Sequence, residues 1–418
     1  MGTLLGDADV WDDTPARPRP LRRGLAALAA GLAAGLAVGW AVAPRPAPVP
    51  PRVTLPAAAA AAPAPAGGAA VLDQAALAGP MLVTGPGNLQ QVQPDGSGSR
   101  VVAALPPVAV LPAAGGGPLV ALGGEAVVAA GRDQTATRLT GDDFRARGIA
   151  GRGGRVLACG RRPLPPEQRL AAREAGRDDT ANAPARLLRA GGGHAERVGL
   201  ACPVAWAAGA GVVAGAGGAQ VPFRSTTRGT SVLVGRPGGP LRTLLDRREL
   251  EAATGPGASV GALALSPDGG LLAVAAGAPG GRWAVLLLPL RPNAADRRVR
   301  RIALADGYEA AWLAFTGGGE PRLAVAALDR RGGLGSAELA QRPGDGYVLG
   351  YEPASGAAAV LVAGRPLWRA DGFAFSPDGQ VLAVSSPDGW TLLRTDQPTE
   401  RASPRLGGTL LAWPGGAA

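Results

Sequence analysis

The sequence predicts an all-β fold, a β-propeller of seven four-stranded blades that follows one transmembrane helix and a linker rich in proline and alanine. Three observations predict this arrangement. Near the N-terminus twenty consecutive residues carry no charge, and the next segment contains eight prolines. Farther along, one ten-residue pattern occurs twice, as LSPDGGLLAV at 265–274 and FSPDGQVLAV at 375–384. Six or eight blades also fit the spacing of the repeats.

The basic composition has a genomic explanation. All 42 basic residues are arginine, and the formal net charge is +10. A chain without lysine that holds 66 glycines and 40 prolines is typical of a GC-rich genome. The arginines are scattered, and aromatic residues make up only 4% of the chain. Nucleic-acid binding proteins gather such residues on one face, so no nucleic-acid partner is expected.

The uncharged segment GLAALAAGLAAGLAVGWAVA, residues 24–43, predicts a transmembrane helix. At ~1.5 Å per residue it spans a hydrocarbon core of ~30 Å. Arg45 and Arg52 are the nearest arginines after it, whereas four precede it: Arg17, Arg19, Arg22 and Arg23. The positive-inside rule then places residues 1–23 in the cytoplasm as a short tail. We therefore expect a single-pass protein of the cell membrane whose C-terminal domain is extracytoplasmic.

A cleaved signal peptide is the alternative to this signal anchor. Ala41-Val42-Ala43 has the small-x-small form of a cleavage site. However, Pro44 follows directly, and the apolar stretch is longer than an ordinary signal-peptide core. These features favour the anchor, and both readings export the rest of the chain.

Three glycines in this helix raise the possibility of a homodimer. Gly31, Gly35 and Gly39 recur every four residues and share one helix face. Small residues on one face let a second helix approach closely. In a segment rich in alanine and glycine the same spacing also arises by chance.

Residues 44–70 form the expected Pro/Ala-rich linker. Prolines hold a chain near polyproline II and prevent it from packing into a core. At ~3.1 Å per residue the linker reaches on the order of 70 Å from the bilayer. Residues 71–418 are then the extracytoplasmic β-propeller.

Six related hairpins follow one another about 40 to 60 residues apart in this domain. Each places a large or apolar residue before a tight turn and an apolar strand after it. The residues before the turn are Leu111, Ala150, Trp206, Leu265, Phe315 and Phe375. One or two further apolar runs follow each hairpin, and four strands at such a period are typical of a propeller blade.

The two clearest turns have a structural explanation. Proline fixes φ at the second turn position, aspartate accepts backbone hydrogen bonds, and glycine takes the positive φ that closes the turn. We therefore expect turn roles, not catalytic roles, for six residues: Pro267, Asp268, Gly269, Pro377, Asp378 and Gly379.

The ends of the domain indicate how the ring closes. LLAWPGG at 410–416 predicts a lone inner strand, whereas residues 81–105 contain three strands without an inner partner. Together they make one shared blade. Six further blades give the expected total of seven.

These repeats resemble the TolB-like, WD-type family of bacterial β-propellers, whose repeat has the form FSPDGxxLAV. The match is close at 263–275 and 373–385 and partial at 313–325. The resemblance implies the propeller fold and a habit of binding proteins or glycans. It assigns no catalytic residue, because the repeat itself is structural.

Three long segments between second and third strands are the expected binding loops, at 160–197, about 217–230 and 329–346. Strand order places them on one face, and long loops on a rigid scaffold often carry function. The alternative is that they are insertions tolerated at a surface. The candidate binding residues are Arg161, Arg162, Arg169, Arg173, Arg177, Arg224 and Arg228. They favour a mildly anionic partner, such as an envelope protein or a cell-wall polymer.

Cys159 and Cys202 are the only cysteines. Because an exported chain meets an oxidising environment, they are expected to form a disulfide near the ring at the long-loop face. Two buried thiols are the alternative. A metal site is not expected, since two distant cysteines lack ligand spacing.

The sequence favours a binding or scaffold module over an enzyme. His194 is the single histidine and lies in a glycine-rich stretch, and without lysine no phosphate-binding loop of the usual kind is possible. We expect no catalytic residue, no metal ligand and no cofactor. The alternative is a propeller-type hydrolase or lactonase with a metal in its channel, which metal analysis of the purified protein would distinguish.

Overall fold

A computed structural model of the chain divides into two compact units, Met1–Val49 and Pro50–Ala418. The structure describes residues 52–53, 72–73, 77, 79–105, 107–111, 119–130, 136–152, 154–175, 179–207, 210–217, 229–278, 281–290, 299–316, 321–329, 346–363, 367, 370–386, 389–397, 401–404 and 406–414. The expected helix at 24–43 lies outside these residues, as do Gly31, Gly35 and Gly39. In the described part, no helix has the length and apolar character needed to span a membrane.

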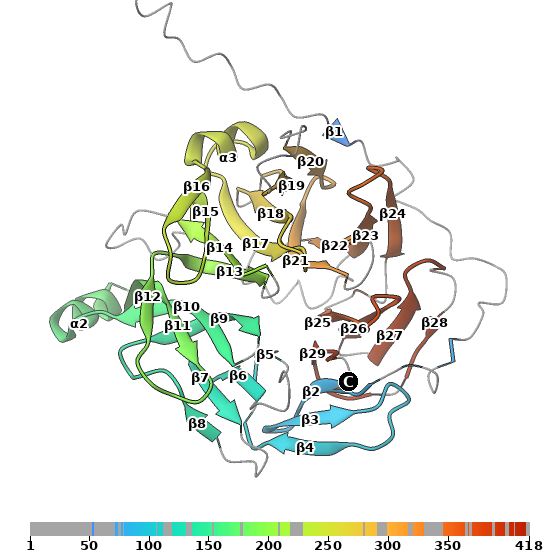
Figure 1. The fold of residues 1–418 in the computed structure, drawn as a ribbon, viewed down its shortest axis with the longest axis horizontal. Coiled ribbons are helices and arrows are strands. Elements are labelled where there is room, and N and C mark those ends of the chain that lie inside the picture. Colours follow the sequence, from blue (N-terminus) through green and yellow to red (C-terminus); the bar gives the residue numbers. More distant parts are fainter. Residues whose placement is uncertain are drawn as a thin grey trace, which may run out of the picture. The chain divides into compact units, whose positions relative to one another are not determined.

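The second unit is an all-β propeller of seven blades, as the sequence predicts (Figure 1). Blade 1 consists of β29 (Leu410–Ala412), β2 (Met81–Gly85), β3 (Asn88–Val92) and β4 (Arg100–Ala103). Blade 2 consists of β5 (Ala109–Leu111), β6 (Leu119–Gly123), β7 (Ala126–Ala130) and β8 (Ala136–Arg138). Blade 3 consists of β9 (Arg145–Arg152), β10 (Arg155–Pro163), β11 (Thr180–Arg189) and β12 (Glu196–Val198).

Blade 4 consists of β13 (Ala201–Ala207), β14 (Val212–Gly217), β15 (Ser231–Gly235) and β16 (Leu241–Leu245). Blade 5 consists of β17 (Ser259–Leu265), β18 (Leu271–Gly277), β19 (Trp283–Pro289) and β20 (Arg300–Ala303), with β1 (Arg52–Val53) parallel to β20. Blade 6 consists of β21 (Tyr308–Phe315), β22 (Leu323–Asp329), β23 (Gly346–Tyr351) and β24 (Ala358–Ala363). Blade 7 consists of β25 (Gly372–Phe375), β26 (Val381–Ser386), β27 (Gly389–Arg394) and β28 (Arg401–Ala402).

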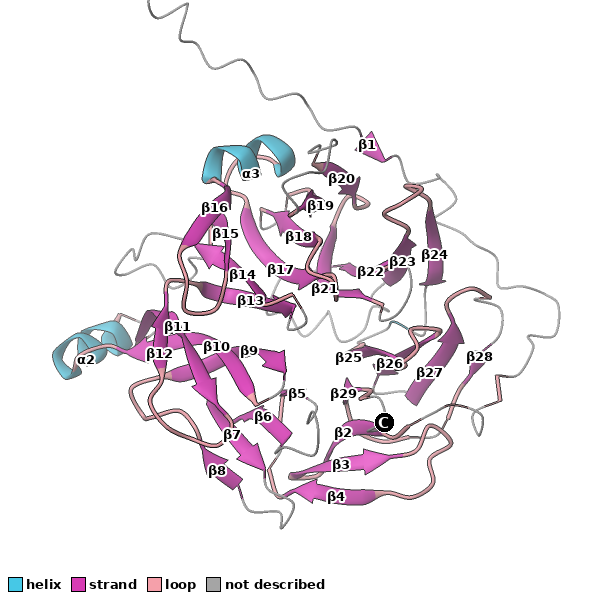
Figure 2. Ribbon diagram, in the orientation of Figure 1, coloured by secondary structure: helices cyan, strands magenta, loops and turns pink. Residues whose placement is uncertain are grey.

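Two helices of the described part lie at the outer edge of the ring, α2 (Pro166–Glu174) and α3 (Arg247–Thr254) (Figure 2). Helix α3 connects blades 4 and 5. It begins with a capping box, in which Asp246 accepts from the backbone N–H of Glu249 at 2.8 Å and its own N–H donates to the Glu249 carboxylate. Such a cap satisfies N–H groups that a helix start leaves without partners.

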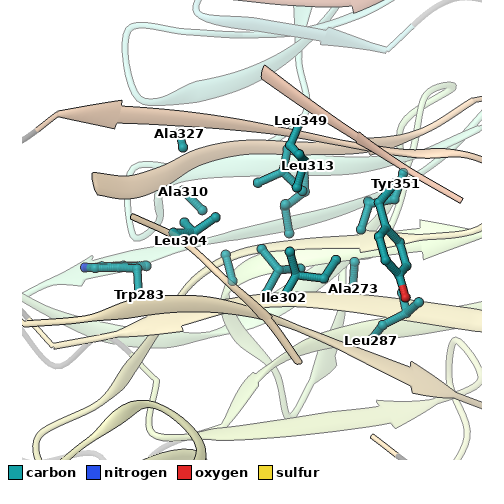
Figure 3. Close-up of a cluster of buried hydrophobic side chains, with 14 of the residues drawn as sticks. Ala273, Trp283, Leu287, Ile302, Leu304, Ala310, Leu313, Ala327, Leu349 and Tyr351 are labelled. Carbon is teal, nitrogen blue, oxygen red and sulfur yellow. The ribbon is translucent and has the colours of Figure 1, made fainter. Parts of the chain in front are cut away.

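The repeated LAV motif is explained by the packing of the second strands. In β18, residues 272–276 are fully buried. Leu272 and Val274 pack with blade 4 residues, whereas Ala273 and Ala275 pack in the cluster shared with blade 6 (Figure 3). Because side chains alternate between the faces of a strand, a strand enclosed on both faces reads as a continuous apolar run.

The two clearest turns join the first and second strands of blades 5 and 7. Asp268 accepts from Ser266 Oγ at 2.6 Å and from the N–H of Gly270 at 3.0 Å. The Ser266 hydroxyl in turn accepts from the N–H of Leu271 at 2.9 Å. Gly269 has φ +66° and follows Pro267. The same hydrogen bonds recur in the turn of blade 7, where Ser376, Pro377, Asp378 and Gly379 take the corresponding positions.

The ring closes where the sequence predicts, because β29 pairs with β2 and completes blade 1. The N–H of Thr84 donates to the Thr409 carbonyl at 2.9 Å, and the N–H of Thr409 donates to Thr84 Oγ1 at 2.9 Å. Asp371, which lies directly before β25 of blade 7, accepts from Thr409 Oγ1 at 2.8 Å. The ring is therefore closed by the short pairing of β29 with β2 and by hydrogen bonds that involve the side chains of Thr84, Thr409 and Asp371.

Gly408 tests this closure. It has φ +84°, and a Cβ there would collide with the Thr84 carbonyl oxygen. We expect Gly408→Ala to lower the free energy of unfolding by about 1–3 kcal/mol, because the new side chain is strained in the left-handed region and also displaces β2. Chemical denaturation of the purified chain measures this loss.

Gly407→Ala is the matched control, since a Cβ at Gly407 meets no atom within 4 Å. Its stability should stay near that of the wild type. Equal losses in both variants would contradict the role of Gly408 in closure.

Candidate arginine cavity

The segment 160–197 is not one loop, contrary to the sequence-based expectation. Strands β10 and β11 continue outward as a paired extension in which Arg161 faces Asn182 and Pro163 faces Thr180 across the ladder. Helix α2 follows, and β11 and β12 then complete the blade. Sequence reasoning missed this because polar residues on an outer strand give no clear apolar alternation.

The four candidate arginines that the structure describes therefore lie on regular elements. Arg161 and Arg162 end strand β10, whereas Arg169 and Arg173 lie on α2. The structure does not describe the other three, Arg177, Arg224 and Arg228. Of the other two expected loops, residues 218–228 and 330–345 also lie outside the described residues.

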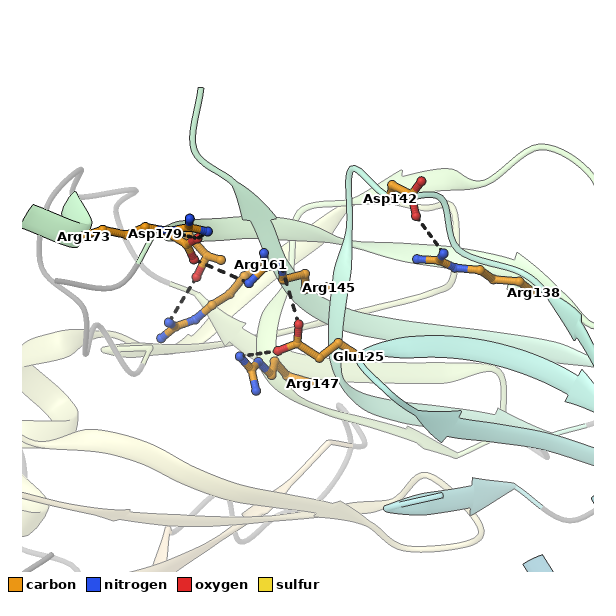
Figure 4. Close-up of polar contacts among 9 residues, drawn as sticks. Glu125, Arg138, Asp142, Arg145, Arg147, Arg161, Arg173 and Asp179 are labelled. Carbon is orange, nitrogen blue, oxygen red and sulfur yellow. Dashed lines mark hydrogen bonds and ion pairs between the residues drawn. The ribbon is translucent and has the colours of Figure 1, made fainter. Parts of the chain in front are cut away.

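An ion-pair network fixes α2 to the propeller (Figure 4). Asp179, at the start of β11, accepts from Arg173 Nη2 at 2.8 Å and lies 3.4 Å from Arg145 Nη1 of β9. The hydrogen bonds from Arg173 lower the pKa of Asp179. In the β6–β7 turn of blade 2, Glu125 pairs with Arg147 at 2.7 Å and with Arg145 at 3.6 Å. The network thus joins blade 2, blade 3 and the helix.

Arg161 and Arg162 have different surroundings although they are neighbours. Consecutive strand residues point to opposite faces of a sheet. Arg161 is partly buried and donates to Thr180 Oγ1 at 3.4 Å, and burial together with the charge of Arg147 lowers its pKa. Arg162 is exposed and lines a cavity. Arg161 therefore belongs to the scaffold, and Arg162 to the candidate site.

The cavity has a volume of about 560 Å³ and lies on blade 3 beside the connection from blade 2. Its lining comes from the β8–β9 connection, the end of β10, α2, β11 and β12. The lining residues are Asp142, Asp143, Arg162, Pro163, Arg169, Ala183, Pro184, Arg186 and Arg197. We call this site the arginine cavity.

Both carboxylates of the arginine cavity are already paired. Asp143 accepts from Arg186 through both oxygens, with Nη1 to Oδ1 at 3.1 Å. This bidentate contact lowers the pKa of Asp143. The Arg186 side chain is only 15% exposed, and its guanidinium lies 4.6 Å from the centre of the Phe144 ring. Asp142 pairs with Arg138 at 2.7 Å.

Three arginines of the lining remain without such partners. The side chains of Arg162, Arg169 and Arg197 form no ion pair or hydrogen bond with any residue in the part of the chain that the structure describes. At longer range, the charge of Arg197 helps to lower the pKa of Asp143, and that of Arg169 helps to lower the pKa of Asp179. Arg197 lies opposite Arg186 in the ladder between β12 and β11. Three arginines without ion pairs thus line one cavity, and guanidinium matches carboxylate and phosphate oxygens well.

Arg162 and Arg169 were candidates from the sequence, whereas four charged residues of the cavity were not: Asp142, Asp143, Arg186 and Arg197. Arg186 and Arg197 meet only through the register of β11 and β12. The two aspartates belong to the preceding blade connection. Neither relation can be read from spacing along the chain.

Cys159 and Cys202 form a disulfide, as expected. It joins β10 of blade 3 to β13, the inner strand of blade 4, across 43 residues of sequence. Cys202 lies within β13, next to its first residue. The bridge therefore encloses two strands of a blade as well as α2. Cys159 is 1% exposed, and Gly148 leaves room for its sulfur.

No metal centre is found in the ranges that the structure describes, where no group of three or more His, Cys, Asp or Glu is placed to hold an ion. His194 is exposed in the β11–β12 connection. The positions expected for turns at Pro267, Asp268, Pro377 and Asp378 lie outside the arginine cavity.

No protein-family model matches the chain, and no curated protein matches it significantly. Solved structures with a similar fold include three proteins at low sequence identity. Oligogalacturonate lyase from Vibrio parahaemolyticus is 10% identical, with TM-score 0.48 over 80% of this chain and 87% of its own. TolB from Acinetobacter baumannii is 12% identical, with TM-score 0.42 over 82% of this chain and 68% of its own.

The tricorn protease is 11% identical, with TM-score 0.39, and the match covers 76% of this chain but only 37% of the protease. Propellers similar in fold thus include enzymes as well as TolB. At these identities the similarity concerns the fold alone and does not decide between a binding module and an enzyme.

Removal of the disulfide should destabilise the propeller. In the chain-entropy description, a bridge across 43 residues stabilises the folded state by about 4 kcal/mol. We expect the double variant Cys159→Ser/Cys202→Ser to lose about 2–5 kcal/mol of unfolding free energy in urea. Dithiothreitol should produce a similar loss in the wild type and none in the variant. A wild-type protein whose stability does not respond to reductant would contradict this expectation.

The Arg186–Asp143 contact should be measurable by carboxyl NMR titration. Because the folded-state pKa of Asp143 is lowered, the pair contributes stability above the ordinary aspartate pKa of about 3.9 and loses it as the pH falls through the lowered value. Arg186→Gln should return the pKa of Asp143 towards the ordinary range. The exposed Arg242→Gln is the control and should leave it unchanged.

Proposed function

We propose that the chain is a non-catalytic, membrane-anchored extracytoplasmic β-propeller that binds an anionic envelope component, protein or polymer, at the arginine cavity. The observation that carries this proposal is that Arg162, Arg169 and Arg197, whose side chains form no ion pair in the described part, line one cavity of about 560 Å³. Unpaired charges of one sign in a concave site attract a ligand of the opposite sign.

The rigidity of the surroundings supports a binding role. Arg162 and Arg197 stand on strands, and Arg169 stands on a helix tied to β9 through Asp179. The disulfide holds β10 against the next blade. The backbone that carries these arginines is therefore held in place and loses little conformational freedom on binding, which favours affinity.

The proposed location rests on the sequence and on the disulfide. The uncharged segment 24–43 with arginines before it supports a signal anchor. Disulfides persist mainly in oxidising compartments, so the Cys159–Cys202 bridge supports an extracytoplasmic propeller. Of the expected linker at 44–70, Arg52 and Val53 pair with β20 of blade 5, so only the residues between the anchor and Arg52 would give the propeller reach into the envelope.

A capture experiment with matched charge variants tests the proposal. Full-length protein is used as bait for solubilised envelope material, beside the triple variant Arg162→Gln/Arg169→Gln/Arg197→Gln. The control variant is Arg236→Gln/Arg242→Gln/Arg248→Gln, which removes the same charge from exposed positions on blade 4 and α3. We expect capture that weakens with salt, persists with the control variant and is lost with the cavity variant.

Equal capture by both variants would contradict the assignment to the arginine cavity. A stoichiometric, tightly bound calcium or zinc ion in the purified chain would contradict the non-catalytic part of the proposal and favour a metal-dependent hydrolase.

A further inference from the structure

We propose that the ligand of the arginine cavity carries a phosphomonoester group, whose dianion binds between Arg162, Arg169 and Arg197. This inference rests on the proposed function and names the chemical class of the ligand at the same site. It follows from the number of free guanidinium groups, from the pairing of the carboxylates and from the size of the cavity.

The number of guanidinium groups matches a phosphomonoester. Three arginines line the cavity without ion-pair partners in the part of the chain that the structure describes. A phosphomonoester presents three strong acceptor oxygens and a charge of about −1.5 to −2 at neutral pH. A carboxylate presents two oxygens and one charge. Of these two groups, only the phosphomonoester offers a separate terminal oxygen to each arginine, and it carries the larger charge.

The pairing of the two aspartates keeps the site open to an anion. An unpaired carboxylate in the lining would repel phosphate. Asp143 is held by Arg186 through two hydrogen bonds, and Asp142 is held by Arg138 at 2.7 Å. Arg186 is therefore a positioning residue, because it neutralises Asp143 and is itself fixed over the Phe144 ring.

The volume of the cavity indicates that the phosphate is part of a larger molecule. Small-molecule sites usually have volumes of roughly 300 to 1,000 Å³, and this cavity has about 560 Å³. Pro163, Pro184 and Ala183 supply apolar wall beside the arginines. The space beyond the phosphate thus suits an uncharged carrier of about the size of one sugar or amino-acid unit.

Titration calorimetry of the full-length protein tests this inference with N-acetyl-O-phosphoserine amide, whose only charged group is the phosphate. N-acetyl-aspartate amide is the carboxylate probe. At about pH 7.5 we expect the phosphate probe to bind at least about tenfold more tightly, because it makes more charge-assisted hydrogen bonds. Each change among Arg162→Gln, Arg169→Gln and Arg197→Gln should weaken it about tenfold, whereas Arg236→Gln/Arg242→Gln/Arg248→Gln should not.

The pH dependence gives an independent measurement. The second pKa of a phosphomonoester is about 6, so at about pH 5 most of the probe is a monoanion and its binding should weaken several-fold. Inorganic sulfate keeps its charge, and its binding should not change. The charged groups of the lining are four arginines and the paired Asp142 and Asp143. His194 lies three residues before Arg197, so His194→Gln, which should keep the same pH dependence, is the control variant.

The outcomes separate this inference from the proposed function. Equal binding of the two probes, no binding of the phosphate probe, or binding unaffected by the three arginine variants would each overturn the phosphate assignment. If envelope capture still depended on the three arginines, the proposed function would stand without it. Displacement of the captured component by the phosphate probe, but not by the carboxylate probe, would support both. Circular dichroism of each variant excludes loss of the fold as the cause.

Discussion

Closure of the ring is the constraint on which the rest of this structure depends. Each blade packs against two neighbours, so an open ring would leave one face of two blades exposed. The closing contact joins Thr84 to Thr409, which are 325 residues apart in the sequence. Trp413 supports it by donating from Nε1 to the Gly79 carbonyl at 3.0 Å. Joining such distant segments costs conformational entropy. Burial at the blade interfaces of the closed ring offsets this cost, which makes closure cooperative.

The composition of the chain suits this packing because a large side chain that lies across the face of a blade needs small residues beside it in the same sheet. Trp283 of β19 is buried against Gly261 and Gly277, and a Cβ at either glycine would collide with its ring. Ala273 and Ala275 pack in the same cluster, which blade 5 shares with blade 6 (Figure 3). Close packing of large against small side chains removes voids, which are costly in a core. The abundance of alanine and glycine is thus compatible with a well-packed propeller, whatever its genomic origin.

The seven-bladed ring could be predicted from the sequence, whereas the arginine cavity could not. The SPDG turns, the apolar second strands and the split blade at 81–105 and 410–412 are local signals, and each leads directly to the seven-bladed fold. The arginine cavity depends on relations that are not local. Arg186 meets Arg197 through strand register, and it meets Asp143 across a blade boundary. The extended hairpin of β10 and β11 is also hidden in the sequence, because its polar residues resemble a loop.

Phe144 connects the packing of the ring to the chemistry of the arginine cavity. Its ring is 1% exposed and packs in the core cluster between blades 2 and 3 with Val127 and Val156. The guanidinium of Arg186 lies over this ring and donates hydrogen bonds to Asp143, which directly precedes Phe144 in the chain. Packing of the two blades therefore sets the position of Arg186, and Arg186 decides whether Asp143 repels an anion. A surface site built in this way takes its precision from the core, which explains how a propeller can hold a charged cavity at its outer edge without a long loop.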